Sequence, residues 1–343
     1  MKSIYDFSLK ELEGYFLSKQ ESPYRSAQIF EWLYRHRITD FLEMKNIKKT
    51  VIEEMKADFE LESLTLVKEE VSVDSTRKFL FKLSDGNTIE TVLIQHPYGR
   101  SLCLSTQVGC NFGCAFCASG QQKKVRNLRV AEMTLQVLEV EKITGLKISH
   151  LVVMGIGEPF DNFDNLLSFL KIVNYAKGLA IGARHISVST AGLVPKIIEY
   201  ADFPLQTNLA ISLHAANDEI RSKLMSINRK YPLKELIKAI DYYIEKTNRR
   251  VTLEYILINN INDRPQDALD LFNLFKGRLV YVNLIPYNEV EGNNYKRSTP
   301  ENTNRFFDKL KKLGLNVTMR REHGQEINAA CGQLRDKHVA KKT

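Results

Sequence analysis

The sequence predicts an α/β fold: a partial barrel of six strand–helix units, preceded by helices and a short β segment. Two observations support this prediction. From residue 101 onward, short apolar strands alternate with longer stretches of helical periodicity, the pattern of a parallel sheet whose strands are connected by helices. Glycines and small polar residues then follow one strand after another, as expected where a parallel sheet carries a ligand site at one edge.

The N-terminal part, residues 1–62, is expected to be a helical accessory domain. Ser8 and Glu11 have the spacing of a capping box, and apolar residues recur on one face of the helix that would follow. A second helix is expected from Ser22 onward and a third over Ile47–Phe59. The second would end in a basic and aromatic stretch, which suits either a solvated helix end or an edge that contacts phosphate.

Residues 63–95 show a period of two and are expected to form a β-hairpin linker. The stretches Leu64–Val67, Lys78–Leu83 and Thr88–Ile94 predict strands. Asp85-Gly86 between the last two is typical of a hairpin turn.

Residues 96–326 are expected to form the core, followed by a C-terminal segment, 327–343. The predicted strands are Ser101–Gln107, His150–Met154, His185–Thr190, Asn208–Leu213, Val251–Ile258 and Tyr281–Ile285, with a further strand near Asn316–Arg320. The intervening helices include Val130–Ile143, Leu166–Ala176, Leu233–Lys246 and Gln266–Phe275, with one more near Thr299–Lys312. Six such units are too few for a closed eight-stranded barrel, so a partial, TIM-like (β/α)6 barrel is predicted.

Composition limits the class of protein. The 343 residues carry a formal net charge of +8, which is compatible with a polyanionic partner. No apolar run approaches the length needed to cross a membrane, and the N-terminus lacks the pattern of a secretion signal. Four of the five cysteines lie between Cys103 and Cys117, which favours metal or redox chemistry in a reducing cytoplasm over a disulfide framework.

The spacing of Cys110, Cys114 and Cys117 is the strongest single signal. Structural zinc usually takes four ligands in paired knuckles, and a [4Fe–4S] cluster normally takes four thiolates. Three thiolates on a glycine-rich loop therefore suggest a cluster with one iron open to another ligand. Buried or zinc-binding cysteines remain the alternative.

Polar and glycine residues follow the predicted strands. They are Gly155, Gly157 and Glu158 after the second strand, Ser189 after the third, Ser212, Leu213 and His214 after the fourth, and Asn288 after the sixth. Each is weak evidence alone, because Gly155 and Gly157 also suit an ordinary turn and His214 a hydrogen-bonded core position. Together they predict one rim that holds a polar cofactor.

These motifs resemble those of known proteins. The cysteine motif, with Phe116 before its last cysteine, resembles that of the radical S-adenosylmethionine (SAM) superfamily, and Gly157-Glu158-Pro159 resembles its glycine-rich strand end. Asn328–Leu334, which contains Cys331, is similar to the C-terminal signature of the RlmN/Cfr family of radical SAM RNA methyltransferases. The resemblance extends over the whole chain, through Cys103–Cys110, Arg126–Leu128, Arg184–Thr190, Leu209–Ala215 and Val282–Pro286.

The resemblance implies a mechanism in which Cys331 carries the methyl group. One SAM molecule would methylate Cys331, and a second would be cleaved at a [4Fe–4S] cluster on Cys110, Cys114 and Cys117 to give a radical. That radical would take a hydrogen atom from the methyl group, whose carbon then adds to adenine. Glu90 would accept the ring proton, and Cys103 would resolve the adduct through a transient disulfide with Cys331.

The resemblance also implies ligands and partners. SAM would be bound by Gly157, Glu158, Ser189, Ser212, Leu213, His214 and Asn288. The substrates would be 23S rRNA and tRNA, and the N-terminal domain would bind RNA. Flavodoxin or ferredoxin would donate the electrons. The enzyme would be a cytoplasmic monomer without a membrane contact. Ile156, Ala216 and Ser226 depart from the common family pattern without removing a functional group.

Three other readings stay open at this point. A Cfr-type enzyme would methylate carbon 8 of adenine instead of carbon 2 and confer antibiotic resistance; Val108, where Cfr-type sequences often have another cysteine, favours the RlmN branch. A non-catalytic RNA-binding protein would use a cluster or zinc structurally. A radical SAM activase would act on a partner protein.

Four basic residues follow the cysteine loop and suit either phosphate contacts or a solvated basic loop. They are Lys123, Lys124, Arg126 and Arg129.

Overall fold

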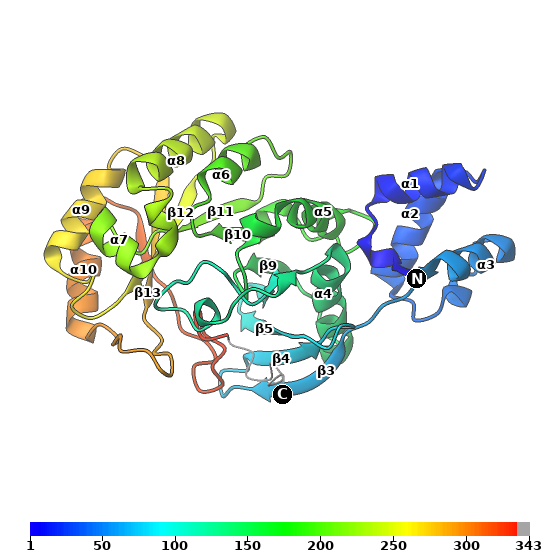
Figure 1. Ribbon diagram of the computed structural model, residues 1–343, viewed down its shortest axis with the longest axis horizontal. Helices are drawn as coiled ribbons and strands as arrows, with labels where there is room; N and C mark the ends of the chain where they lie inside the picture. The colour runs from blue at the N-terminus through cyan, green and yellow to red at the C-terminus, as the bar shows by residue number, and fades with distance from the viewer. Residues whose placement is uncertain (335–343) are drawn as a thin grey trace.

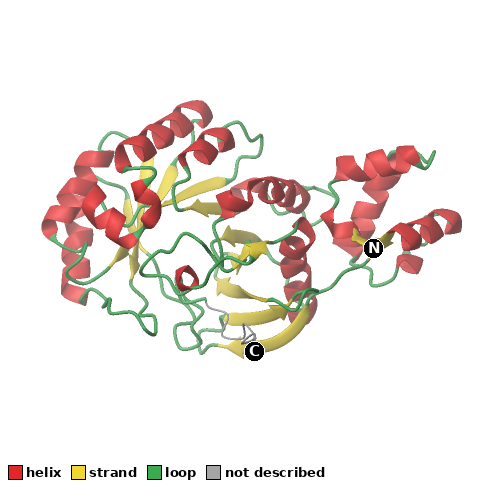
Figure 2. Ribbon diagram, viewed as in Figure 1, coloured by secondary structure: helices red, strands yellow, loops and turns green. Residues whose placement is uncertain are grey.

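The computed structural model describes residues 1–334. The N-terminal helices lie at one end of the molecule, beside a larger part in which helices surround a sheet (Figure 1). Helices and strands of the larger part are interleaved along the chain, whereas the N-terminal part is almost entirely helical (Figure 2). Helices thus predominate in the N-terminal part, and strands alternate with helices in the larger part.

The N-terminal helices are α1 (Leu9–Ser18), α2 (Tyr24–Phe30), the π-helical η2 (Glu31–His36) and α3 (Lys49–Asp58). The expected capping box is present at the start of α1. Ser8 N donates to Glu11 Oε2 at 2.7 Å, and Glu11 N donates to Ser8 Oγ at 3.3 Å. These bonds satisfy backbone donors that the first turn of a helix would otherwise leave unpaired.

Helix α4 (Val130–Thr144) joins the N-terminal helices to the sheet, and it lies between them in Figure 1. Asp6 Oδ1 accepts a hydrogen bond from Ala131 N at 2.9 Å at the start of α4, and Arg37 forms an ion pair with Glu141 near its end. Because it is covered on both sides, α4 is buried along most of its length.

The main sheet has ten strands in the order β14-β13-β12-β11-β10-β9-β6-β5-β4-β3. The strands from β6 to β14 in this order are all parallel to their neighbours. They are β6 (Gly99–Cys103), β9 (His150–Val153), β10 (Ile186–Thr190), β11 (Asn208–Ser212), β12 (Val251–Leu257), β13 (Val280–Pro286) and β14 (Val317–Met319). Across residues 1–334 the edge strands β3 and β14 do not pair with each other, and the predicted α/β partial barrel is confirmed.

The segment 63–95 extends this sheet as three antiparallel strands, β3 (Thr65–Val71), β4 (Arg77–Lys82) and β5 (Thr88–His96). Strand β5 pairs with β6, so the segment expected to be a linker is hydrogen-bonded into the core sheet. The Asp85-Gly86 turn forms as predicted: Gly86 has φ +86°, which favours glycine, and Asp85 Oδ1 accepts from Asn87 N at 3.0 Å.

Helices cover the outer face of the parallel strands (Figures 1 and 2). After α4 they are α5 (Phe163–Asn174), α6 (Val194–Tyr200), α7 (Asp218–Leu224), α8 (Leu233–Thr247), α9 (Pro265–Phe275) and α10 (Pro300–Lys312). Two short sheets add β1 (Lys2–Ser3) with β2 (Phe59–Glu60) and β7 (Gln107–Val108) with β8 (Arg126–Asn127). Within residues 1–334, no helix combines the length and apolar character needed to span a bilayer.

Candidate active site

The carboxyl ends of the parallel strands surround a cavity, which we call the cysteine cavity. Its lining includes Cys110, Cys114, Cys117, Gly157, Glu158, Ser189, Ser212 and His214. The structure thus brings the cysteine motif together with polar residues that follow three other strands. Leu213 is fully buried beneath the rim, and its carbonyl oxygen accepts a hydrogen bond from Arg221 Nε at 3.1 Å.

The cysteine loop owes its path to two glycines. A Cβ atom at Gly109, which has φ +72°, would lie 2.3 Å from the carbonyl oxygen of Lys123. A Cβ atom at Gly120 would lie 2.8 Å from the carbonyl oxygen of Cys114. The loop can therefore fold tightly on itself only with glycine at these positions.

The three thiols fit the group that the resemblance implies. Burial raises the pKa of Cys110 to about 12, and it raises the pKa of Cys114 well above its usual value, with the charges of Cys117 and Cys110 adding to the effect. Buried thiols in such proximity stay ionised only when a cation compensates their charge, which the irons of a cluster would do. Among the described residues, no three His, Cys, Asp or Glu side chains converge on one point as ligands of a single ion would.

The glycines after β9 let this strand end lie directly against its neighbours. A Cβ atom at Gly155 would be 2.6 Å from the carbonyl oxygen of Leu104, and one at Gly157 would be 2.6 Å from Cβ of Gln107. The Gly155 amide donates to the carbonyl oxygen of Leu104 at 3.0 Å. The strand end can consequently offer backbone groups to a ligand.

Glu158 connects two of the loops at this rim. Its Oε1 accepts from Phe160 N at 3.0 Å, and its Oε2 accepts from Ala191 N at 2.8 Å, so the loops after β9 and β10 share one carboxyl group. Burial raises the pKa of Glu158 to about 7. Because both carboxyl oxygens are engaged by protein amides, the backbone of Glu158 is the better placed part for contacting a ligand.

His214 follows β11 in a left-handed backbone conformation, φ +58°. Its Nδ1 accepts a hydrogen bond from Ile256 N at 3.1 Å, so the ring hydrogen is on Nε2. Burial lowers the pKa of His214 to about 3, with the charge of Arg221 adding to the effect, and the ring is neutral at physiological pH. Next to it, Ser189 Oγ and Ser212 Oγ are 3.4 Å apart.

Arg221 supports this rim from below, and its importance is not evident from the sequence. The side chain is fully buried, and its NH2 group donates to the carbonyl oxygens of Ala191 at 2.8 Å and Ser212 at 3.2 Å. Its NH1 group donates to Asn228 Oδ1 at 2.8 Å. One guanidinium group therefore joins the strand ends of β10 and β11, which carry the predicted cofactor contacts.

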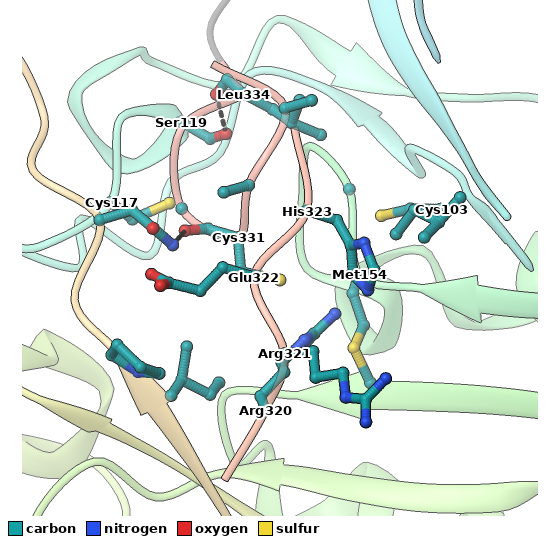
Figure 3. A pocket seen from close by; sticks show the side chains of 18 residues that line it. Cys103, Cys117, Ser119, Met154, Arg320, Arg321, Glu322, His323, Cys331 and Leu334 are labelled. Atoms are coloured by element: carbon teal, nitrogen blue, oxygen red, sulfur yellow. Dashed lines mark hydrogen bonds between the residues drawn. The ribbon is translucent and has the colours of Figure 1, made fainter. Parts of the chain in front are cut away.

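Cys331 and Cys103 line a second cavity, which we call the thiol cavity (Figure 3). Cys117, Met154, Gly155, Arg320 and Cys331 line both this cavity and the cysteine cavity, so Cys331 faces the two of them. Burial raises the pKa of Cys103 to about 12, and the charge of Cys331 adds to the effect.

Two further groups contact the loop of Cys331. Asn288, which was expected to contact SAM, lines the thiol cavity, and its Nδ2 donates to the carbonyl oxygen of Cys331 at 3.3 Å. The pKa of Arg320 is raised by the nearby charge of Cys331 and further by those of Glu254 and Cys103, although burial opposes the shift. Sequence reasoning did not single out Arg320, because only the fold brings it to both cysteines.

Glu90 lines a third cavity, the glutamate cavity, together with Lys78, Ala118, Asn328 and Gln333. It does not line the cavities of Cys331 but lies beside them. On β5, Glu90 is two residues before Val92, which pairs with Cys103 on β6, so the side chains of Glu90, Val92 and Cys103 share one face of the sheet. The chain from Asn328 to Gln333 runs past all three cavities.

The basic residues after the cysteine loop are largely engaged within the protein. Lys124 pairs with Asp161 at 2.6 Å, Arg126 pairs with Glu132 at 2.8 Å, and Arg129 pairs with Asp6. Lys123 is exposed. Three of the four cations thus already have carboxylate partners, which weakens their interpretation as phosphate contacts.

Comparison with known proteins agrees with this geometry. The model of the radical SAM superfamily matches residues 104–272, and that of the ribosomal RNA large subunit methyltransferase N-terminal domain matches residues 2–61. A crystal structure of a radical SAM methyltransferase from Sphaerobacter thermophilus superposes with a TM-score of 0.92 at 42% identity, covering 98% of this chain and 99% of the other.

Curated relatives are similar over the full length. The "Probable dual-specificity RNA methyltransferase RlmN" of Exiguobacterium sibiricum is 51% identical, covering 99% of this chain and 98% of the relative. The protein of the same name from Enterococcus faecalis is 52% identical with the same coverage. Both the helical N-terminal part and the partial barrel are thus shared, and the chain belongs to the RlmN family of dual-specificity RNA methyltransferases within the radical SAM superfamily.

Proposed function

We propose that this protein methylates carbon 2 of adenine in RNA and that Cys331 carries the methyl group to the ring. The observation that supports this proposal most is the position of Cys331, which lines both the cavity of the cysteine motif and the cavity of Cys103. A thiol in this position can receive a methyl group on one side and be released by a second thiol on the other.

Cys110, Cys114 and Cys117 would hold the [4Fe–4S] cluster, and the rim from Gly157 to His214 would hold SAM. The bound cluster and SAM supply the one-electron chemistry that generates a carbon radical. The protein's own contribution is to bind and orient SAM. The neutral His214 ring can donate a hydrogen bond through Nε2, and the backbone at Gly157 and Glu158 can accept one from an ammonium group.

Carbon 2 of adenine is electron-poor, so direct displacement of the SAM methyl group by the ring is unfavourable. A thiolate is a good nucleophile, and the Cys331 sulfur would take the methyl group from SAM, breaking the bond between its carbon and the sulfonium. Arg320 and Cys331 line the same two cavities, so a cationic side chain accompanies the sulfur where it would meet SAM.

Release of the product requires a base and a second thiol. After a bond has formed between the Cys331 methylene carbon and the ring, Glu90 would take the ring hydrogen as a proton while one electron leaves to a one-electron acceptor. The Cys103 sulfur would then attack the Cys331 sulfur. A disulfide forms, the bond from sulfur to the methylene carbon breaks, and this carbon takes a proton to become the methyl group.

The substrates we propose are an adenosine of the peptidyl-transferase centre in 23S rRNA and the adenosine 3′ of the anticodon in tRNA. The relatives described above are named as dual-specificity RNA methyltransferases, and the N-terminal helices match a domain named for ribosomal RNA methyltransferases. We further propose that the protein acts as a monomer in the cytoplasm, with flavodoxin or ferredoxin as the electron donor.

The test is mass spectrometry of 23S rRNA and tRNA from cells that lack their own enzyme and express this protein. We expect a methyl group on carbon 2 that is absent with Cys331→Ala. We also expect Cys103→Ala to leave a covalent protein–RNA species, because the adduct forms but is not resolved. A methyl group on carbon 8 would move the protein to the Cfr branch with its mechanism intact, and no methyl group from cluster-loaded protein would overturn the proposal.

A further inference from the structure

Four charged side chains of alternating sign form a row across the antiparallel part of the sheet. Lys78 Nζ is 3.3 Å from Glu90 Oε1 and 3.1 Å from Glu70 Oε2, and Lys68 Nζ is 2.9 Å from Glu70 Oε1. The exposure of these side chains rises from 8% at Glu90 and 9% at Lys78 to 31% at Glu70 and 57% at Lys68. The row therefore leads from a buried carboxyl group to the surface.

The strand register explains how these residues meet. Glu70 on β3 lies opposite Lys78 on β4, and Glu90 on β5 lies opposite Leu80, two residues along β4 from Lys78. Side chains two residues apart point to the same face, so the whole row is on the face that lines the glutamate cavity.

A buried carboxylate is costly unless a cation accompanies it, and Lys78 is almost as buried as Glu90. Glu70 in turn accompanies Lys78. Burial works against the ionised form of Glu70, but hydrogen bonds from Lys68 and Lys78 outweigh it and lower the pKa of this carboxyl group. The arrangement keeps the ammonium group of Lys78 beside Glu90, and the four charges of the row add up to zero.

Two further acidic residues lie at this cavity. Glu289 and Glu291, in the loop after β13, also line it. Glu289 is paired with Lys296 at 2.9 Å, which reduces its influence. Cys103, on the same sheet face, is buried and has a raised pKa, so it adds little negative charge. Among residues 1–334, Lys78 is thus a cation in direct contact with Glu90.

We propose that Lys78 is a positioning residue for the release step: it keeps Glu90 ionised and held in place on the sheet, while Glu70 shares the same ammonium group. This inference rests on the proposed role of Glu90 as the base. It assigns the row of charges on β3, β4 and β5 to catalysis rather than to stability alone.

The test measures how fast the covalent protein–RNA species is resolved to methylated RNA, in a single turnover and as a function of pH. Lys78→Met removes the ammonium group and leaves a side chain of similar length. Without this cation, Glu90 should stay protonated up to a higher pH. We expect the acid limb of the pH–rate profile to shift to higher pH by about one to three units. Below the shifted limb, the rate should fall about tenfold for each pH unit. Lys78→Arg should restore the wild-type profile, and Lys82→Met, at an exposed position on the same strand, should leave it unchanged.

Glu70→Gln provides a result of opposite sign. Lys78 would then keep its charge while losing its other carboxylate, so Glu90 should ionise more readily and the acid limb should move to lower pH. A general loss of structure would not produce this shift, and the variant tests the inference even if Lys78→Met does not fold. The methylation of Cys331 by SAM, measured on the intact protein by mass spectrometry, should be unaffected in both variants.

Glu90→Gln separates the two proposals. If this variant resolves the covalent species at the wild-type rate, Glu90 is not the base and the proposed role of Glu90 fails. If Glu90→Gln traps the covalent species while Lys78→Met and Glu70→Gln keep the wild-type pH profile, the role of Glu90 stands and the inference about Lys78 is overturned.

Discussion

The backbone amide of Ala118 donates a hydrogen bond of 2.8 Å to the carbonyl oxygen of Gly332. Each of these residues directly follows a cysteine of the proposed mechanism, Cys117 in one loop and Cys331 in the other. The next residue after Ala118, Ser119, donates a hydrogen bond from its Oγ to the carbonyl oxygen of Leu334 at 2.6 Å. Figure 3 shows this bond at the wall of the thiol cavity. The loop of the proposed methyl-accepting thiol is thus bonded to the loop that would hold the cluster.

Ser119→Ala should loosen this connection. It removes the hydrogen bond from Ser119 Oγ and leaves the buried carbonyl group of Leu334 without this donor, a change that costs about 1–3 kcal/mol. We expect SAM to be cleaved with less methyl transfer, because the Cys331 loop would no longer be held at the radical. The measurement is the ratio of 5′-deoxyadenosine to methylated RNA, which should rise severalfold.

The matched control is Ser18→Ala, which also removes a bond from a serine hydroxyl group to a backbone carbonyl, that of Tyr15 at 2.7 Å, but at an exposed position in α1. Its ratio should equal that of the wild type. An unchanged ratio in Ser119→Ala would show that the hydrogen bond has no part in coupling the two loops.

Gly155→Ala should disrupt the cysteine cavity. The new methyl group would overlap the carbonyl group of Leu104, whose oxygen and carbon would lie 2.6 and 2.7 Å away, and a backbone carbonyl group cannot turn aside as a side chain can. We expect the free energy of unfolding to fall by about 1–3 kcal/mol and SAM binding, measured by equilibrium dialysis, to weaken at least tenfold.

Gly14→Ala is the control for Gly155→Ala. Gly14 lies in α1, where an added methyl group would meet no atom within 4 Å. Alanine is the better helix former, so this variant should be more stable by up to about 1 kcal/mol with unchanged SAM binding. Equal stability of the two variants in urea unfolding would contradict the steric argument.

Arg221→Met should uncouple the ends of β10 and β11. The guanidinium group donates to the carbonyl oxygens of Ala191, Ser212 and Leu213, and methionine would leave all three without this donor in a buried setting. We expect a loss of about 3 kcal/mol or more in the free energy of unfolding, together with weaker SAM binding. Lys223→Met, on the exposed face of the same helix, should change neither quantity. A wild-type SAM affinity in Arg221→Met would show that the rim does not depend on this residue.

The position of the proposed cofactor rim could be predicted from the sequence because its parts follow strands directly. Parallel strands bring their carboxyl ends to one edge, so Glu158, Ser189 and His214 had to lie near one another once the strands were recognised. The cysteine motif could be recognised equally well, because its three cysteines are close in the chain. What a position does is harder to predict than where it lies: the carboxyl group of Glu158 binds protein amides, and Asn288 contacts the backbone of Cys331.

The residues that were missed depend on contacts between distant parts of the chain. Arg221 and Lys78 look like ordinary basic residues until the fold buries them beside specific acceptors. Arg129 was named in the sequence, but its pairing with Asp6, 123 residues away, could not be predicted for the same reason. The segment 63–95 was expected to be a linker because its period of two predicts strands but does not say with which strand they pair.

His214 provides a prediction about stability and pH. Its pKa is lowered to about 3 by burial first and by the charge of Arg221, whereas an unfolded histidine binds a proton near pH 6.5. Below pH 6.5 the unfolded state therefore holds the extra proton. The contribution of His214 to the free energy of unfolding is complete above this pH and is lost as the pH falls toward the folded pKa.

His214→Asn removes this contribution, and asparagine tolerates the backbone angle of φ +58° at this position. The measured quantity is the free energy of unfolding in urea of the wild type minus that of the variant. This difference should shrink by up to about 1.4 kcal/mol for each pH unit below about pH 6. Taking the difference cancels the groups that both proteins share. A difference that stays constant from neutral to mildly acidic pH would mean that the folded protein protonates His214, and the ring could not then serve as a neutral hydrogen-bond donor to SAM.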